Sequence, residues 1–487
     1  MQRLVRNMPG SADLIADTAQ EISTLESLLS DTVAAWGYRE VRTPIVEEAD
    51  LFLRKSGGEL AARLYRVEDP GGRKAALRPE LTASTIRAFI TLVDQPLLPV
   101  RWRYRGPVFR RQTSAGASGL NQVTQVGAEL IGSSSHLADV ETVLVACDGI
   151  RRAGVEGASV RFGHLGIVSG LLRAFGLSDR AELFLLTRLT GLRERADPVN
   201  SLLEEARLLR LTANDTDKDD RTPLTSLTGL DADQALAVVK QMVASFGPTW
   251  VGSRDMRDVE DRLLEKLQSS DDPAKLEGAA EMLVELVSTT GAAPTVIAAA
   301  DNVVASRSLE RGLLDPAREL ASFLSGTTGI QEIDQIWDFG FAPGLAYYTG
   351  LVFEVTHPSQ PDWPLAGGGR YDGLIKALGG PDLPALGFAY TAEALLAVLD
   401  RSEKGPGTSD QTPLEAVVVP RRLADSAVAL AEAERLRGPD RSRVVVIYPE
   451  PGQIDAAREY AISNGARTFV MIGPKGPHSV SLEDLPN

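Results

Sequence analysis

The chain has 487 residues, with 51 lysines and arginines against 66 aspartates and glutamates, and its formal net charge is −15 at pH 7. This length allows two or three domains with a large buried core, and the 43% hydrophobic and 24% charged content is typical of a globular protein. The acidic balance disfavours a general nucleic-acid-binding surface, although a local basic patch stays compatible with it.

The single cysteine, Cys147, excludes an intramolecular disulfide and indicates a reducing compartment. The histidines are scattered, so we expect no zinc site. They are His136, His164, His357 and His478. The N-terminus lacks the apolar run of a signal peptide, and the chain has no stretch of about 18 apolar residues that could span a membrane. We therefore expect a cytoplasmic protein without a metal or cofactor.

The first part of the chain predicts a helix followed by an antiparallel sheet. Residues 13–36 carry apolar positions at helical spacing, and Gly37 ends that helix. Residues 38–46 alternate like a strand that meets a turn at Thr43 and Pro44. Further strands are expected at 64–67, 75–77, 102–109 and 122–131. Turn signals separate some of these strands, which is typical of an antiparallel meander.

The middle of the chain changes character. Residues 156–325 are rich in Leu, Ala, Glu, Asp and Arg and predict a mostly helical insertion, with a solvated loop at 214–222 (NDTDKDDRT). Strand patterns return at 332–339, 351–355 and 385–390, and a helix begins at Ala392.

The last part of the chain predicts a separate small unit. Residues 403–413 have the composition of a flexible linker, and alternating strand and helix patterns follow it. The strands are expected at 414–419, 444–448 and 468–472, and the helices at 421–437 and 452–464. We therefore divide the chain into a core of two parts, 1–155 and 326–402, a helical insertion at 156–325, and a small α/β domain at 414–487.

Five segments in order carry a family resemblance. They are 77–82 (LRPELT), 101–112 (RWRYRGPVFRRQ) with 124–129 (TQVGAE), 346–354 (AYYTGLVFE), 366–374 (AGGGRYDGL) and 386–389 (LGFA). Together they resemble histidyl-tRNA synthetase and its relatives, with 37–44, 106–112 and 386–396 similar to class II motifs 1, 2 and 3. The resemblance implies an α+β fold: a class II aminoacyl-tRNA synthetase-like antiparallel sheet flanked by helices. It also implies a homodimer core and likens 414–487 to a shortened anticodon-binding domain.

The resemblance also points to an amino-acid pocket. Free histidine offers N–H donors on its ammonium group and its ring, and buried donors need acceptors. Glu80, Thr82, Gln125 and Glu129 supply acceptors, and their family counterparts contact the amino group and the ring. Tyr348 matches the tyrosine that hydrogen-bonds the far side of the imidazole, and Tyr347 beside it is expected to wall the pocket. The alternative is that Glu80 and Glu129 are solvated strand ends.

The cations expected for adenylation are incomplete. The family has an arginine before a GLDYY element, where this chain has Pro343, and Ala346 replaces the aspartate of that element. Ala394 stands at the motif 3 arginine, and Asn121 at an arginine of the motif 2 loop. Because adenylation builds negative charge that cations must stabilise, we expect no catalytic residue in this chain.

Two arginines remain as candidates for phosphate binding. Arg110 in motif 2 would suit the α-phosphate of ATP. Arg370 either binds phosphate or holds a strand–helix junction together, and the sequence leaves both roles open.

The segment 347–354 (YYTGLVFE) is similar to one branch of the family, the regulatory subunit of ATP phosphoribosyltransferase. That resemblance implies a non-catalytic subunit that binds histidine as an effector and controls a separate short catalytic subunit, in a hetero-oligomer, at the first step of histidine biosynthesis. It implies no tRNA partner. Two alternatives stay open: a divergent histidyl-tRNA synthetase, which explains 414–487 but not Pro343 and Ala394, and an RNA-binding synthetase homologue.

Overall fold

A computed structural model of the chain describes residues 6–15, 17–54, 62–68, 71–94, 96–111, 120–209, 211–212, 271–344, 347–399, 414–439 and 443–482. The predicted loop at 214–222, the predicted linker at 403–413 and Ala346 lie outside the described residues. The chain forms two compact units. Unit 1 comprises 1–167, 289–302 and 310–487, and unit 2 comprises 168–288 and 303–309.

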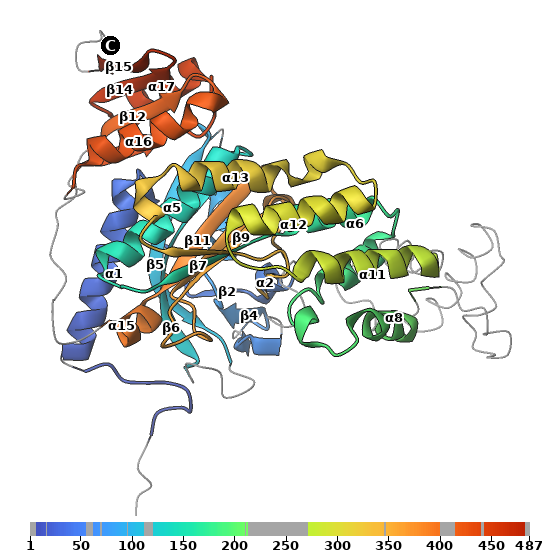
Figure 1. Cartoon of the computed structure of the whole chain (residues 1–487). Helices are drawn as coiled ribbons and strands as arrows, with labels where there is room; N and C mark the ends of the chain where they lie inside the picture. Colours follow the sequence, from blue (N-terminus) through green and yellow to red (C-terminus); the bar gives the residue numbers. More distant parts are fainter. Residues whose placement is uncertain are drawn as a thin grey trace, which may run out of the picture. The chain divides into compact units, whose positions relative to one another are not determined.

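An eight-stranded sheet forms the centre of unit 1 (Figure 1). Its strands, in spatial order, are β1 (Arg39–Glu40), β5 (Val100–Phe109), β6 (Gln122–Ile131), β11 (Ala385–Thr391), β10 (Ala366–Arg370), β9 (Leu351–Thr356), β7 (Ser159–His164) and β8 (Asp334–Trp337). The predicted antiparallel arrangement is confirmed for five of the seven neighbouring pairs, whereas β1–β5 and β7–β8 are parallel.

Two long helices, α1 (Asp17–Ala35) and α5 (His136–Arg152), pack against this sheet and against each other. Every residue of α5 from Leu137 to Ile150 is buried, so this helix is enclosed on all sides. The Ser135 side chain caps its start by accepting a hydrogen bond from the Leu137 amide at 3.2 Å. The predicted stop of α1 is confirmed, since the helix ends at Ala35 and Gly37 follows with φ of +89°.

A small sheet in the order β2-β4-β3 lies between the first helix and the motif 2 strands in sequence. Its strands are β2 (Val46–Glu48), β3 (Arg66–Glu68) and β4 (Lys74–Leu77), accompanied by α2 (Ala49–Leu53) and α4 (Thr82–Leu92). The strand predicted over 38–46 is interrupted between β1 and β2. Pro44 lacks an amide hydrogen for a sheet ladder, and the Thr43 carbonyl instead accepts a hydrogen bond from Arg78 Nη1 at 2.8 Å.

The helical region is less separate than the sequence suggests. Strand β7 lies inside the predicted 156–325 insertion, yet it pairs with β9 and β8 in the main sheet. Between residues 310 and 399, unit 1 also contains α13 (Asp315–Ser325), α14 (Leu374–Ala377) and α15 (Ala392–Val398), with short 3-10 turns at Arg311–Leu314 and Thr328–Ile330. Helices α6 (Leu165–Arg173) and α12 (Ala293–Ser306) run from unit 1 into unit 2.

Unit 2 is helical in the part that the structure describes. It contains α7 (Asp179–Leu186), a 3-10 turn at Leu192–Glu194, α8 (Pro198–Leu208) and α11 (Pro273–Val287). Both α8 and α11 begin with an aspartate cap followed by proline, Asp197-Pro198 and Asp272-Pro273, which places a residue without an amide hydrogen where the helix cannot use one. The two helices pack against each other (Figure 1).

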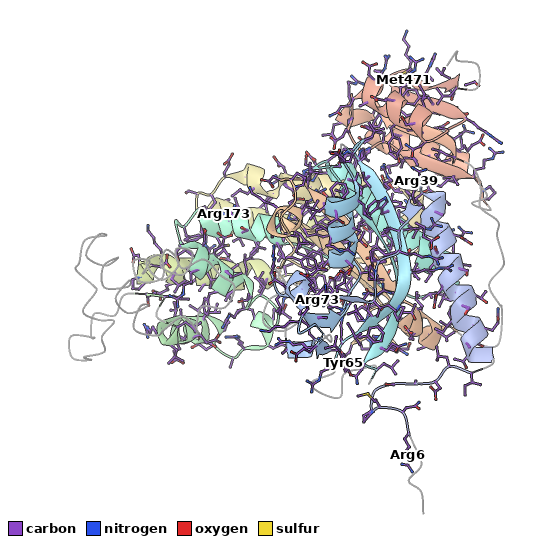
Figure 2. The ribbon with its side chains drawn as sticks, turned by 180° about the vertical axis from the view of Figure 1, so that it is seen from behind. Arg6, Arg39, Tyr65, Arg73, Arg173 and Met471 are labelled. Atoms are coloured by element: carbon purple, nitrogen blue, oxygen red, sulfur yellow. The ribbon has the colours of Figure 1, made fainter. Side chains whose placement is uncertain are left out.

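The C-terminal end of the chain, where the sequence predicts an α/β unit, forms a four-stranded sheet with two helices. It has the sheet order β13-β12-β14-β15, formed by β12 (Leu414–Pro420), β13 (Val444–Ile447), β14 (Thr468–Gly473) and β15 (Gly476–Ser481). Helices α16 (Ser426–Arg437) and α17 (Ile454–Ser463) accompany the sheet, with a 3-10 turn at Leu423–Asp425. Strand β15 was not predicted from the sequence. Figure 2 shows the side chains from the reverse side, with Arg39 on β1 and Met471 on β14 labelled.

Buried polar contacts join this α/β unit to the large sheet within unit 1. Arg101 on β5 donates to both carboxylate oxygens of Glu141 at 2.8 Å, and its Nη2 also donates to the Ile447 carbonyl at 2.8 Å. The hydroxyl of Tyr38 donates to Glu141 at 3.0 Å. Nearby, the buried Arg437 guanidinium stacks 3.4 Å from the centroid of the Trp36 ring. The α/β unit therefore supplies one of the hydrogen-bond acceptors for the buried guanidinium of Arg101.

No helix among the described residues is both long enough and apolar enough to cross a membrane.

Candidate functional site

One face of the large sheet carries the predicted pocket residues at alternate positions of neighbouring strands. Glu129 on β6 lies opposite Trp102 on β5 and opposite Gly387 on β11, and Gly387 lies opposite Gly369 on β10. On the other face, Arg101, Arg103 and Arg105 reach helices α1 and α5. The alternation of β5 (VRWRYRGPVF) thus sends arginines to the helices and the residues between them to the pocket face.

Glu129 is the buried acid at the centre of this face. Its carboxylate accepts a hydrogen bond from the Tyr104 hydroxyl at 2.9 Å and another from the Tyr371 hydroxyl. Burial raises the pKa of the Glu129 carboxyl to about 8, although hydrogen bonds from Tyr371, Thr82 and Tyr104 act in the opposite direction. The reading of Glu129 as a solvated strand end does not fit, because the residue is fully buried.

This raised pKa predicts a pH dependence of stability. Since the pKa of Glu129 is higher in the folded state than in the unfolded chain, its protonated form stabilises the fold at low pH, and that contribution is lost as the pH rises from about 4.5 through about 8. We expect the Glu129→Gln variant, which mimics the neutral acid, to lose less free energy of unfolding than the parent between pH 5.5 and pH 8. Urea unfolding of both proteins at the two pH values measures this, and equal losses would contradict the buried acid.

Glu80 and Thr82 meet Glu129 at the start of α4. Both carboxylate oxygens of Glu80 accept a hydrogen bond from the Ala83 amide, at 3.0 and 3.1 Å. Burial raises the pKa of Glu80, whereas the charge of Arg110 and the neighbouring Thr82 lower it, and Thr82 acts in the same direction on the pKa of Glu129. Arg110 donates from Nε to the Pro79 carbonyl at 2.6 Å. The guanidinium of Arg110 therefore lies near the carboxyl group of Glu80, which in turn lies near that of Glu129.

Gln125 and two tyrosines complete the predicted set. Gln125 is 9% exposed, and within the described part of the chain its Oε1 atom has no hydrogen-bond partner. The rings of Tyr347 and Tyr348 lie 5.0 Å apart, and that of Tyr347 lies 5.7 Å from Tyr371. Burial raises the pKa of both Tyr347 and Tyr348, and the neighbouring carboxyl groups of Glu80 and Glu129 act in the same direction. An acceptor without a donor in a buried site is available to a ligand N–H.

Glycines make room for these groups. A Cβ atom at position 387 would stand 1.7 Å from Glu129 Oε2, and one at position 369 would stand 3.1 Å from the Tyr348 ring. The glycine run of 367–369 is therefore part of strand β10 rather than a turn. At positions 369 and 387 the groups beside Tyr348 and Glu129 are therefore backbone atoms and not side chains.

Arg370 occupies the second of the two roles left open by the sequence. Its Nε donates to Asp139 at 2.9 Å, and its Nη1 donates to the Ser133 carbonyl at 2.8 Å. Further contacts join it to Asp372 at 3.3 Å and to the Ser135 carbonyl at 3.3 Å. These contacts hold β10 against the start of α5 and leave the guanidinium engaged with protein groups.

Three positions where the family resemblance implies an arginine carry an uncharged residue in this chain, namely 121, 343 and 394. Pro343 is half-buried, and Ala394 is fully buried within α15. The neighbour of Ala394, Glu393, accepts the Thr124 amide at 2.9 and 2.8 Å, so motif 3 is tied to β6. Asn121 binds the Pro9 carbonyl through Nδ2 at 2.8 Å. None of the three side chains brings a positive charge to the site.

Sequence reasoning missed Tyr104 and Tyr371 as the donors to Glu129. Both lie in segments that carry the family resemblance, RWRYRGP and GGGRYDGL. The strand alternation of β5 could have placed Tyr104 on the pocket face, because Tyr104 is two residues from Trp102. Tyr371 follows the last residue of β10, where no periodicity predicts its direction.

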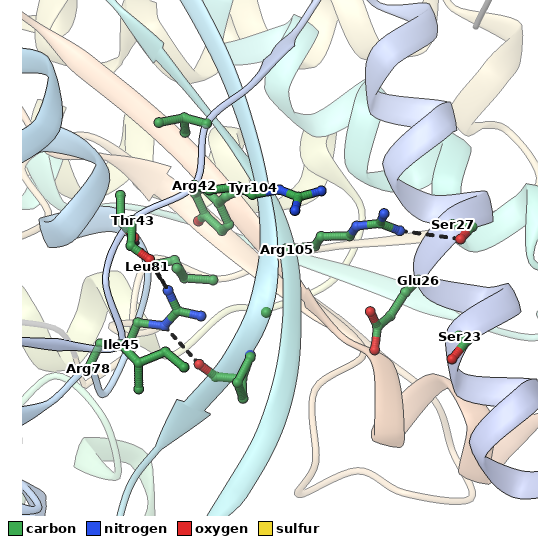
Figure 3. Close-up of a pocket in the computed structure, with 13 residues that line it drawn as sticks. Ser23, Glu26, Ser27, Arg42, Thr43, Ile45, Arg78, Leu81, Tyr104 and Arg105 are labelled. Carbon is green, nitrogen blue, oxygen red and sulfur yellow. Dashed lines mark hydrogen bonds between the residues drawn. The ribbon is translucent and has the colours of Figure 1, made fainter. Parts of the chain in front are cut away.

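A cavity of about 550 Å³ lies in unit 1 and shares Tyr104 with the environment of Glu129 (Figure 3). It is lined by Ser23, Glu26, Ser27, Val41, Arg42, Thr43, Ile45, Arg78, Leu81, Tyr104, Arg105, Gly106 and Pro107. Arg105 donates to the Ser27 hydroxyl at 3.3 Å, and burial raises the pKa of Glu26 against the charge of Arg105. The cavity contains no residue of the predicted histidine set, so it is not the amino-acid site.

Comparison with known proteins identifies the family to which this chain is similar. The family model for histidyl-tRNA synthetase matches residues 10–208 and 238–395. The histidine–tRNA ligase of Methanosphaerula palustris is 30% identical over 81% of this chain and 76% of its own length. That of Methanocaldococcus jannaschii is 26% identical over 98% of this chain and 94% of its own length. The predicted class II synthetase-like fold is confirmed.

A solved structure from Bacillus halodurans C, described as an ATP phosphoribosyltransferase regulatory subunit/histidyl-tRNA synthetase, has a TM-score of 0.54. The match covers 97% of this chain and 99% of that one, but at 18% identity it shows the fold alone.

The interpretation as a regulatory subunit of ATP phosphoribosyltransferase is wrong. The relatives found over most of the chain are named histidine–tRNA ligases, and these findings support the ligase alternative instead. The physical reason is that the YYTG segment places Tyr347 and Tyr348 beside Glu80 and Glu129, as one wall of the predicted amino-acid pocket. Such a wall specifies a ligand and carries no information about a second subunit. The expectation that the chain is not an enzyme loses its support as well.

Proposed function

Because this chain belongs to the histidyl-tRNA synthetase family, we propose that it is a divergent histidine–tRNA ligase. The observation that carries the proposal is the set of buried acceptors around one pocket. Glu80, Gln125 and Glu129 are each at most 9% exposed, and Gln125 Oε1 lacks a partner among the described residues. Histidine supplies N–H donors on its ammonium group and its ring for such acceptors, and within the described part of the chain Gln125 Oε1 stays unpaired unless a ligand donates to it.

The reaction joins the histidine carboxylate to the α-phosphorus of ATP and releases pyrophosphate. A terminal hydroxyl of tRNA then takes the histidyl group, and AMP leaves. Negative charge grows on phosphate oxygens in the first step, and a positioned cation stabilises it. Arg110 fits this role, because it lies beside Glu80 and its Nε atom is anchored on the Pro79 carbonyl. Pro343 and Ala394 bring no charge. We therefore expect adenylation that is slow for a ligase of this family.

Histidine-dependent exchange of pyrophosphate into ATP tests the proposal directly. The purified chain is expected to catalyse exchange above background, and Arg110→Ala is expected to reduce its rate by about 100-fold or more. Arg111→Ala is the matched control, since Arg111 is the next residue and is exposed. Exchange by Arg110→Ala at the rate of the control would remove Arg110 from the mechanism.

No exchange by the unaltered chain would contradict the ligase proposal. Two further measurements then identify what remains. Histidine that raises the melting temperature at about millimolar concentration would show an intact pocket without activation. Binding to tRNA that weakens steeply with salt would favour the RNA-binding synthetase homologue.

The proposal includes tRNA as a substrate and so departs from the expectation based on the net charge of −15. A homodimer core, implied by the segment similar to motif 1, belongs to the same proposal. So does a cytoplasmic location, which the single cysteine favours.

A further inference from the structure

A side chain of the C-terminal α/β unit reaches the end of the pocket strands. Glu450, in the loop between β13 and α17, accepts a hydrogen bond from the Ser133 hydroxyl at 2.5 Å. Ser133 is fully buried and lies just after β6, the strand that carries Glu129. Pro449 and Pro451 flank Glu450, so the backbone that presents the carboxylate has little freedom.

Ser133 in turn holds Arg370. The Ser133 carbonyl accepts Arg370 Nη1 at 2.8 Å, and its hydroxyl also accepts the Ser135 amide at 3.3 Å, at the cap of α5. Asp139 in the first turn of α5 fixes the other side of the guanidinium at 2.9 Å. Ser133 therefore contacts both Glu450 of the α/β unit and the buried Arg370 at the end of β10.

Arg370 supports the turn that carries Tyr348. The Thr349 amide donates to the Arg370 carbonyl at 2.8 Å, and the Asp372 amide donates to the Thr349 hydroxyl at 2.9 Å. A Cβ atom at Gly350 would lie 2.9 Å from the Arg370 side chain, so the turn rests on this residue. The Tyr348 ring lies over Gly369, the residue before Arg370.

We infer that Glu450 is a positioning residue for the amino-acid pocket, acting through Ser133 and Arg370 on the 348–350 turn. The inference rests on the proposed function, since it assumes that this pocket binds histidine. A contiguous set of charge-assisted hydrogen bonds between rigid segments transmits a displacement that a flexible surface contact would absorb. The α/β unit thereby regulates the geometry of the pocket wall that faces the ligand.

Three variants of the full chain test the inference. Glu450→Ala removes the acceptor, Glu450→Gln keeps an oxygen that can accept from Ser133, and Glu459→Ala changes an exposed glutamate of the same unit. We expect Glu450→Ala to bind histidine about 3- to 10-fold more weakly by calorimetry and to exchange the amides of 347–350 faster. Glu450→Gln should restore both properties, and Glu459→Ala should match the parent.

A fourth variant removes the same hydrogen bond from its other end. Ser133→Ala is expected to weaken histidine binding by a similar factor, and adding Glu450→Ala to it should cause no further loss. Additive losses, or amide exchange of 347–350 in Glu450→Ala that equals Glu459→Ala, would overturn the inference. If the unaltered chain does not bind histidine, the proposed function fails, and amide exchange of 347–350 still decides whether Glu450 positions this turn.

Discussion

Replacement of Arg101 by methionine is expected to lower the free energy of unfolding by about 3–5 kcal/mol. Arg101 and Glu141 are both nearly inaccessible to water, with side chains 1% exposed, and the arginine makes two hydrogen bonds to the carboxylate. Methionine fills similar space but leaves Glu141 as a buried charge whose remaining hydrogen-bond donor among the described residues is the Tyr38 hydroxyl. Urea unfolding followed by circular dichroism measures the loss.

A matched control separates burial from the loss of any ion pair. Arg54 pairs with Asp50 on the surface at 2.6 Å, with side chains 51% and 61% exposed. Arg54→Met should change the free energy of unfolding by less than about 1 kcal/mol. Adding Glu141→Gln to Arg101→Met should recover part of the loss, because the buried charge is then gone. A stability of Arg101→Met equal to that of the control would mean that the contact with the α/β unit is not formed as described.

Substitution of Gly387 by alanine is expected to weaken histidine binding by about 10- to 100-fold, the range that loss of a hydrogen bond to a charged group predicts. The added Cβ would stand 1.7 Å from Glu129 Oε2 and 2.4 Å from the Ala128 carbonyl oxygen. Because neither neighbour can remain in place, the Glu129 carboxylate has to leave Tyr104 or Tyr371. Calorimetric titration with histidine measures the effect.

The neighbouring strand offers a control of the same chemistry. A Cβ at Gly367 on β10 meets only the Phe353 carbonyl oxygen, at an ordinary 3.6 Å. Gly367→Ala should therefore keep histidine affinity within about threefold of the parent, whereas overpacking at 387 also costs about 1–3 kcal/mol of stability. Equal affinities of Gly387→Ala and Gly367→Ala would show that Glu129 does not contact the ligand.

Much of the main sheet was predictable because its strands carry strong local patterns. The expected strands at 102–109 and 122–131 correspond to β5 and β6, and that at 385–390 corresponds to β11. Strand β7 was missed because its pairing partner β8 lies far along the chain, so its sequence neighbours are helices. Strand β15 was missed because its residues are mostly exposed and its pairing with β14 leaves little hydrophobic signal.

The candidate site could be predicted only in part. Glu80, Thr82, Gln125 and Glu129 could be found from motif positions. The structure brings Glu80, Thr82 and Glu129 together, and Gln125 lies four residues from Glu129 on the same strand. The engagement of Arg370 depends on Asp139 and Ser133, which belong to another element and share no motif with it. The function was misjudged because missing cations at Pro343 and Ala394 indicate slow chemistry, and slow chemistry does not define a different partner.

The order of the strands also determines when this protein can finish folding during synthesis. Strand β6 is made early, yet one of its edges stays open until β11 emerges, after more than half of the chain has been translated. An open edge of this kind can pair with the wrong strand of another nascent chain. Glu129 lies on this open edge of β6. Its carboxyl is buried against Tyr371 and β11, which are synthesised later. The acid at the centre of the pocket therefore cannot be fully enclosed before Tyr371 and β11 have been synthesised.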